Sequence, residues 1–135
     1  MIKAADSSIT IAALWGDHPA HEAATEALAT CQTTIAHVAI ETYSVLTRLP
    51  APHRADATET AGALDERLSS TYAALDAAAY ASAPTRLAGA GVSGGATYDG
   101  LIALTALEHE LEILTRDKRA ERTYRGLNVP YQLLD

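Results

Sequence analysis

The chain has 135 residues, of which 48% are hydrophobic and 20% are charged, so it can bury a core and is not a disordered sequence. Its formal net charge of −7 argues against non-specific binding of nucleic acid, and its single cysteine excludes an internal disulfide. Because no stretch approaches the roughly 20 apolar residues of a membrane span and the N-terminus lacks a signal-peptide layout, we expect a cytoplasmic protein with no membrane partner.

The first half of the chain predicts strands that alternate with helices. Apolar or β-branched runs indicate strands, and runs with apolar residues at helical spacing indicate helices. In chain order these are a strand at 2–5, helices at 7–16 and 21–31, a strand at 33–37 and a helix at 38–49. The hydroxyls of Ser7 and Ser8 suit a helix start, and Pro50 suits the end of the last helix.

The second half continues this alternation. It predicts a polar helix at 54–68, a strand at 69–75, a helix at 76–91 that is broken near Pro84, and a flexible loop at 89–95. These are followed by a buried helix at 99–109, a strand at 111–114, a helix at 118–127 and a strand at 130–134. No internal repeat and no linker interrupts residues 1–135, so we expect one domain. Alternating elements of this kind indicate a parallel sheet with helices on both faces.

Four acidic residues occupy places where this fold would gather them. Asp6 follows the first strand and Asp117 follows "LEILTR", and sites in open parallel sheets form at the carboxyl ends of strands. Glu41 lies in the helix after the second strand, among Val38, Ala39, Ile40 and Val45. Asp99 opens the long buried helix. We therefore expect the four carboxylates to converge.

Helix capping is the simpler explanation for some of these acids. Aspartate is favoured at helix starts, and Asp6, Asp99 and Asp117 each precede or open a predicted helix. Capping does not explain Glu41, because its apolar neighbours place it near a core face, where an unpaired carboxylate is unfavourable.

Several carboxylates in one pocket need positive charge beside them. Magnesium or manganese supplies it, since both prefer oxygen ligands, and a metal with open positions suits phosphodiester hydrolysis. A basic run lies next to Asp117 and could hold flanking phosphates; it consists of Arg116, Lys118, Arg119, Arg122 and Arg125. The alternative is that this run is only a solvated helix face.

The chain resembles a known family in four segments. They are "AADSSI", "HVAIETYSVLTRL", "TYDGLIALTALEHELEILTRDKRA" and "YRGLNVPYQLL", and together they extend over nearly the whole chain. In these segments the chain is similar to PIN-domain ribonucleases, in particular the VapC toxins of bacterial toxin–antitoxin pairs. The segment between residues 50 and 97 is Ala-rich and carries no matching signature.

This resemblance implies a fold, an activity and partners. The fold would be a PIN-like α/β/α sandwich with a central, mostly parallel sheet of four or five strands. Asp6, Glu41, Asp99 and Asp117 would bind Mg²⁺ or Mn²⁺. Ser8 and Thr115 match hydroxyl positions that support such a metal site, and Arg116, Lys118, Arg119 and Arg122 would contact RNA. The substrate would be tRNA or ribosomal RNA, and the partners a VapB-type antitoxin and a second copy in a homodimer.

Two other functions fit the same elements. A PIN-like module could hold RNA or protein without cutting. A receiver-type phosphotransfer domain is also parallel α/β, but it needs a pair of acids after the first strand and a separate lysine late in the chain. Here Asp6 has no acidic neighbour, and Lys118 directly follows an acid. Other polar and aromatic residues receive no functional role: Trp15 and Tyr43 are expected in packing, His18 and His21 at the surface, and His37 without a partner.

Overall fold

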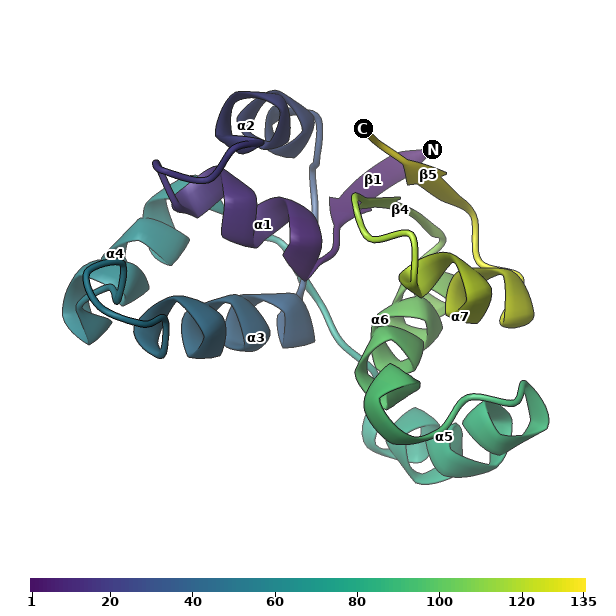
Figure 1. The fold of residues 1–135 in the computed structure, drawn as a ribbon. Helices are drawn as coiled ribbons and strands as arrows, with labels where there is room; N and C mark the ends of the chain where they lie inside the picture. The colour runs from purple at the N-terminus through teal and green to yellow at the C-terminus, as the bar shows by residue number, and fades with distance from the viewer.

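The structure is a computed structural model that describes residues 1–135 (Figure 1). Its strands are β1 (Ile2–Ala5), β2 (Thr34–Ile35), β3 (Tyr72–Ala73), β4 (Leu111–Thr115) and β5 (Tyr131–Leu133). Its helices are α1 (Ser7–Leu14), α2 (His21–Ala29), α3 (Ala36–Thr47), α4 (Ala57–Arg67), α5 (Ala77–Gly89), α6 (Thr97–Glu108) and α7 (Ala120–Gly126), with a 3₁₀ turn η1 (Gly94–Ala96). None of these helices combines the length and apolar character that a membrane crossing requires.

All strand pairs are parallel, as predicted, but the central sheet has three strands rather than four or five. Its order is β1-β4-β5, and β2 pairs with β3 in a separate two-stranded sheet. The two sheets meet where the Gln32 N–H donates to the Lys3 carbonyl at 3.3 Å. The ladder does not extend further because Ala36 already begins α3.

Alternating side chains of β1 and β4 face two different helix layers, as expected for strands buried on both faces. Ala5 and Leu114 pack against α1 and α2, whereas Ala4 and Ile113 pack into the cluster that includes α6 and α7. Figure 1 shows the first layer with α3 and α4 on the left and the second layer with α5 on the right. The carboxyl ends of β1 and β4 lie between these two groups of helices.

The sequence predictions were wrong at several element boundaries. Helix α5 runs through Pro84 without a break, because Pro84 lies on its exposed face, where water can hydrogen-bond the carbonyl released one turn earlier. The following loop is anchored by the buried Val92, and α6 begins at Thr97 rather than at Asp99. In α6 the residues Ile102 and Leu104 are fully buried as predicted.

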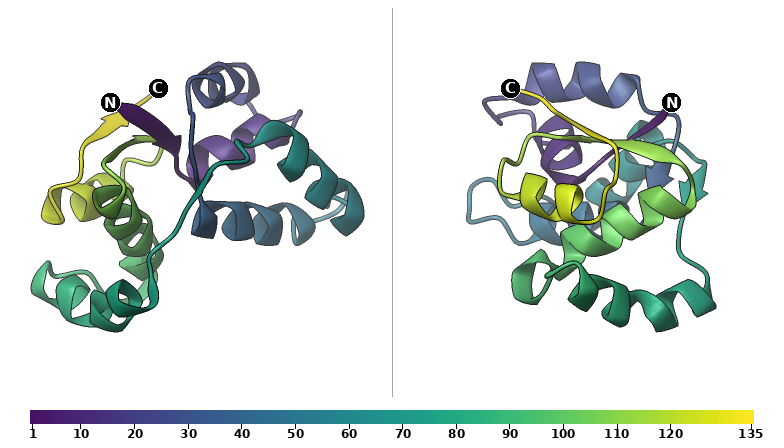
Figure 2. Two further views of the ribbon diagram at one scale, coloured as in Figure 1. Left: turned by 180° about the vertical axis from the view of Figure 1, so that it is seen from behind. Right: turned by 90° about the vertical axis from the view of Figure 1, so that its right-hand side faces the viewer.

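The views in Figure 2 show the first and last strands of the chain together in one sheet. Strand β1 begins at the N-terminus and pairs with β4, and β5 ends near the C-terminus on the other side of β4. Residues from the first and last parts of the sequence therefore lie together at the carboxyl edge of the sheet.

Candidate functional site

Asp6 is the buried centre of the site. The backbone is extended at this residue, directly after β1, and the Asp6 N–H donates to the Leu114 carbonyl at 2.9 Å. Its carboxylate caps α1 by accepting a hydrogen bond from the Ser8 N–H at 3.0 Å on Oδ1. Only 2% of Asp6 is exposed, so a negative charge is held inside the molecule by a strand end and a helix start.

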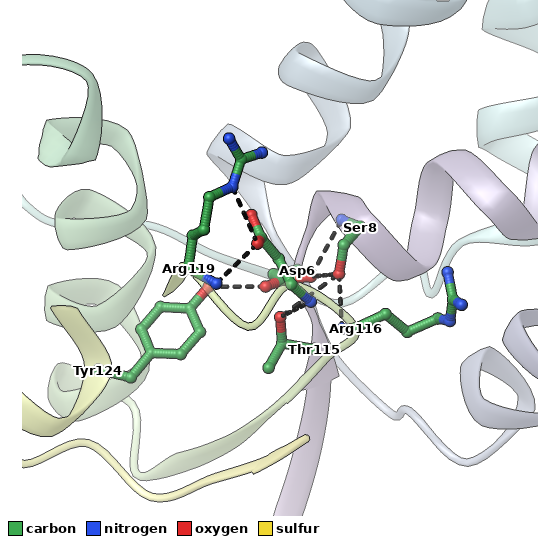
Figure 3. A network of polar contacts seen from close by, with 7 residues as sticks. Asp6, Ser8, Thr115, Arg116, Arg119 and Tyr124 are labelled. Carbon is green, nitrogen blue, oxygen red and sulfur yellow. Dashed lines mark hydrogen bonds and ion pairs between the residues drawn. The ribbon is translucent and has the colours of Figure 1, made fainter. Parts of the chain in front are cut away.

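A chain of hydroxyl groups joins Asp6 to the end of β4 (Figure 3). The Ser8 hydroxyl donates to Asp6 Oδ1 and accepts a 2.8 Å hydrogen bond from the Arg116 N–H. Its oxygen also lies 3.4 Å from Thr115 Oγ1, which accepts from the Asp117 N–H at 3.1 Å. The structure thus places Ser8 and Thr115 between two of the predicted acids.

Tyr124 was missed by the sequence analysis. Its ring is fully buried in α7, and its hydroxyl donates a 2.7 Å hydrogen bond to Asp6 Oδ2. Burial, followed by the charge of Asp6, raises the pKa of Tyr124 above its usual range, so the hydroxyl stays a donor. The sequence feature that could have identified Tyr124 is its place on the buried side of an otherwise polar helix, since a buried tyrosine hydroxyl needs a hydrogen-bond partner.

The two oxygens of Asp6 are thereby both hydrogen-bonded, yet the group remains electrostatically unfavourable. Burial raises the pKa of Asp6, and the hydrogen bonds from Ser8, Thr115 and Tyr124 oppose that rise. No lysine, arginine or histidine is among the buried residues. A buried carboxylate in this condition is stabilised by a neighbouring positive charge.

Asp99 shows that the four acids share one region. Its pKa is raised to about 6, first by burial and then, in decreasing order of effect, by the negative charges of Asp6, Glu41 and Asp117. Asp99 lies in the first turn of α6 but does not cap it, since the N-cap is Ala96 and no side chain caps that end. The capping explanation therefore fails for Asp99.

Glu41 is half-buried rather than enclosed by apolar groups. Among the apolar neighbours that suggested a core face, Val38 and Ala39 are buried, whereas Ile40 is 68% exposed. His37, one turn earlier in α3, has Nε2 3.6 Å from Glu41 Oε2, a distance for an ion pair rather than a hydrogen bond. The His37 imidazole is the main cause that lowers the pKa of Glu41.

Asp117 closes a turn between β4 and α7. Its Oδ1 accepts a 2.9 Å hydrogen bond from the Arg119 N–H, and the Arg119 side chain lies 3.6 Å from the same oxygen. This turn explains part of the preference for aspartate at the position. Because the Arg119 side chain is 95% exposed, it offsets the charge of Asp117 only weakly.

The donor set of this site consists of oxygens, which suits a hard divalent cation such as Mg²⁺ or Mn²⁺. Burial raises the pKa of both Asp6 and Asp99, and neighbouring carboxylates raise that of Asp99 further, so a bound cation would stabilise the ionised forms. The side chains do not form a closed cage, however, since no three His, Cys, Asp or Glu groups are close enough to ligate one ion as they stand. Mg²⁺ keeps several waters, so water can complete a shell to which the carboxylates supply only part of the ligands.

The basic run divides into two parts. Arg116 points away from Arg119 in Figure 3, and its Nε donates to the carbonyl of Asp135 at 3.3 Å. Arg119 and Arg122 instead line a polar hollow of about 440 Å³ between α7 and the turn before α6. Lys118 is exposed, in the turn between β4 and α7. The two hollow-lining arginines are therefore the ones placed to hold an anion beside the acids.

Comparisons with known proteins identify the family of the chain. The model of the PIN domain family matches residues 4–126. Ribonuclease VapC40 of Mycobacterium tuberculosis (strain CDC 1551 / Oshkosh) is 46% identical over 131 residues, which are 97% of this chain and 98% of that protein. Ribonuclease VapC27 of M. tuberculosis (strain ATCC 25618 / H37Rv) is 39% identical over 93% of this chain and 92% of its own length.

Two solved structures share the fold. One is VapBC2 from Rickettsia felis bound to a DNA fragment from their promoter, with a TM-score of 0.67 and 22% identity over 100% of both chains. The other is FitAcB from Neisseria gonorrhoeae, with a TM-score of 0.63 and 19% identity over 97% of this chain and 96% of that chain.

Proposed function

The chain belongs to the PIN-domain family, among its VapC-type ribonucleases, and on this premise we propose that it is an endoribonuclease that acts as the toxin of a toxin–antitoxin pair. It would hydrolyse phosphodiester bonds in RNA, with tRNA or ribosomal RNA in the cytoplasm as the expected targets. Residues 1–135 would act as a single PIN-like domain.

One observation carries the proposal in structural terms: four carboxylates from separate parts of the chain act on one another. Asp6, Glu41 and Asp117 all raise the pKa of Asp99, although they come from a strand end, a helix and a turn, and Asp99 lies in another helix. A set of mutually repelling acids at a sheet edge is unfavourable for folding alone. It is favourable when the site must hold a cation and a phosphate together.

We assign Mg²⁺ or Mn²⁺ to Asp6, Glu41, Asp99 and Asp117. When bound, such an ion supplies an activated water and neutralises charge that develops on the phosphate. Ser8 and Thr115 would fix the orientation of Asp6 and of the β4–α7 turn through the hydroxyl chain described above. Arg119 and Arg122 would hold the RNA backbone next to the acids, with Lys118 and Arg116 further along it.

The expected partners follow from the same family. A VapB-type antitoxin would bind this chain and silence it, and the toxin would form a homodimer. The names VapBC2 and FitAcB support a toxin–antitoxin arrangement, since the shared fold extends over nearly the whole chain.

RNA cleavage by the purified chain tests the proposal. We expect cleavage with Mg²⁺ or Mn²⁺, none in EDTA, and at least about a 100-fold loss in Asp6→Asn and Asp99→Asn. Asp65→Asn is a matched control, because Asp65 is an exposed acid on α4. Cleavage that survives EDTA and both site substitutions would contradict the metal assignment. Tight RNA binding without turnover in any divalent metal would instead identify a binding module.

A further inference from the structure

Two aromatic rings lie at the margin of the acidic site. Tyr98 directly precedes Asp99 at the start of α6, and His37 lies one turn before Glu41 in α3. The two rings are stacked, with centroids 5.3 Å apart and planes 6° from parallel. The pair therefore joins the helices that carry two of the four acids, and each ring is within four positions of a carboxylate.

Tyr98 is unusual among the aromatic side chains because it is both exposed and held in place. It is 56% exposed. Trp15 contacts two histidine rings, and Tyr131 is fixed by a 2.7 Å hydrogen bond to Glu121. Tyr98 instead has one ring partner, which fixes its plane and leaves the rest of its surface open.

His37 is oriented by more than packing. Its Nε2 is buried without a hydrogen bond, and it faces Glu41 Oε2 at 3.6 Å. The histidine thus stands between a carboxylate of the site and the tyrosine ring. This arrangement fixes the tyrosine at a constant position relative to the acids, which is what a ligand platform requires.

We propose that the Tyr98–His37 pair is a nucleobase platform, on which the Tyr98 ring stacks the base of a nucleotide next to the cleaved phosphate. Every nucleobase has a π-face, so such a platform binds unpaired nucleotides with little dependence on sequence. A base in a duplex is already stacked on both faces and cannot use it. The pair accordingly selects single-stranded RNA, and this inference rests on the proposed ribonuclease function for its substrate.

The platform and the arginine hollow divide the recognition of the substrate. Ala96, in the turn that leads into α6, lines the hollow with Arg119 and Arg122, and Tyr98 follows it by two residues. As part of the same proposal, the backbone of a nucleotide whose base lies on Tyr98 would extend toward Arg119 and Arg122. Phosphate contacts fix register, and the stacked base provides the requirement for an unpaired strand.

The test uses a short single-stranded RNA with one 2-aminopurine in each position in turn, and binding is measured in EDTA, where the proposed metal-dependent cleavage cannot proceed. Stacking quenches the fluorescence of 2-aminopurine, so quenching at one or two adjacent positions would locate the platform. We expect Tyr98→Phe to bind and quench as the wild type does. Tyr98→Leu should lose the quenching and bind about tenfold more weakly, as expected for loss of one stacked base.

Two further variants make the result specific. Tyr80→Leu is a matched control, because Tyr80 is an exposed tyrosine on α5, and it should bind and quench normally. Tyr98→Trp keeps a larger ring and should bind at least as tightly as the wild type. If Tyr98→Leu fails to fold by circular dichroism, a comparison of Tyr98→Trp with Tyr98→Phe still tests the platform through the expected order of quenching.

The outcomes separate this inference from the proposed function. Equal binding and quenching by the wild type and Tyr98→Leu would overturn the platform, even if both cleave RNA. Loss of quenching in Tyr98→Leu would support it, even if the wild type cleaves no RNA, because binding is measured without divalent metal. In a protein that does cleave, Tyr98→Leu should raise KM for the single-stranded RNA about tenfold with kcat nearly unchanged. When the same RNA is annealed to its complement, Tyr98→Leu and the wild type should behave alike.

Discussion

The Tyr124 hydroxyl lies 2.7 Å from Asp6 Oδ2, and this hydrogen bond joins side chains 118 positions apart in the chain. It connects the last helix to the end of the first strand at the centre of the acidic site. Since Ser8 engages the other Asp6 oxygen, the carboxylate is held from both sides and has one orientation toward the remaining acids.

Tyr124→Phe should lower stability and metal affinity together. The substitution keeps the buried ring but removes a hydrogen bond to a charged group, so we expect the free energy of unfolding to fall by about 1–2 kcal/mol. Loss of a group that orients a metal ligand typically weakens binding about tenfold or more, which a Mn²⁺ titration by calorimetry measures. Tyr131→Phe also removes a hydroxyl that donates to a carboxylate, that of Glu121, and should leave Mn²⁺ affinity unchanged. Equal effects of the two substitutions on Mn²⁺ would contradict a role for Tyr124 at the site.

Asp99→Asn should stabilise the protein near neutral pH when no metal is present. The pKa of Asp99 rises from 3.8 to about 6 on folding, so the folded state binds this proton more tightly than the unfolded state does. The ionised group therefore destabilises the fold above about pH 6, and its unfavourable contribution disappears as the pH falls toward about 4. After allowance for partial solvent screening, we expect Asp99→Asn to gain about 1–2 kcal/mol at about pH 7.5.

Urea unfolding in EDTA at about pH 7.5 and about pH 4.5 measures this effect, because the gain should shrink at the lower pH. Asp65→Asn should show no comparable gain at either pH. A destabilising effect of Asp99→Asn near neutral pH in EDTA would mean that the Asp99 carboxylate stabilises the fold, contrary to the electrostatics described above.

Substitution of both Arg119 and Arg122 by glutamine should weaken RNA binding and reduce its salt dependence. For each phosphate of a single strand that the protein no longer neutralises, the slope of log affinity against log salt becomes shallower by about 0.7. Fluorescence anisotropy with a short RNA at several salt concentrations gives this slope. Arg54→Gln is a suitable control, because the Arg54 side chain donates to the Leu49 carbonyl in the connection between α3 and α4. An unchanged slope in the double variant would mean that these arginines are only a solvated surface.

Gly100→Ala should destabilise the protein, because Gly100 lies where α6 packs closely on the preceding segment. An added Cβ would overlap Leu87 Cδ2 and approach Val92 Cγ1 to 3.1 Å. Such overpacking costs about 1–3 kcal/mol, measurable by thermal or urea unfolding. Gly62→Ala is the opposite case: Gly62 lies in α4 with nothing near its added Cβ, so alanine should stabilise by about 0.5–1 kcal/mol. A neutral Gly100→Ala would show that Leu87 moves aside freely.

The sequence was sufficient to predict the elements that position the site. Strand β1, strand β4 and the buried helix α6 are confirmed, since their apolar runs have clear periods and lengths. The order of these elements alone predicts that Asp6 and Asp117 lie at one edge of the sheet, because neighbouring parallel strands end at the same edge.

Features that depend on tertiary contacts could not be predicted in the same way. Ile40 looked like a core residue but is 68% exposed, because the buried face of α3 is formed by Val38, Thr42 and Leu46 instead. Pro84 looked like a helix break, but its exposed position allows α5 to continue. Tyr124 carries no local signal of its contact with Asp6, since that contact exists only when the first and last elements meet.

The pairing of β1 with β4 also determines when the site can exist during synthesis. A polypeptide still growing on the ribosome has made Asp6 and Ser8 long before Thr115, Arg116 and Tyr124 emerge, and those later residues complete the hydroxyl chain and the tyrosine contact. A nascent or prematurely terminated copy therefore has an unassembled centre. Such fragments should therefore lack the activity of the finished chain.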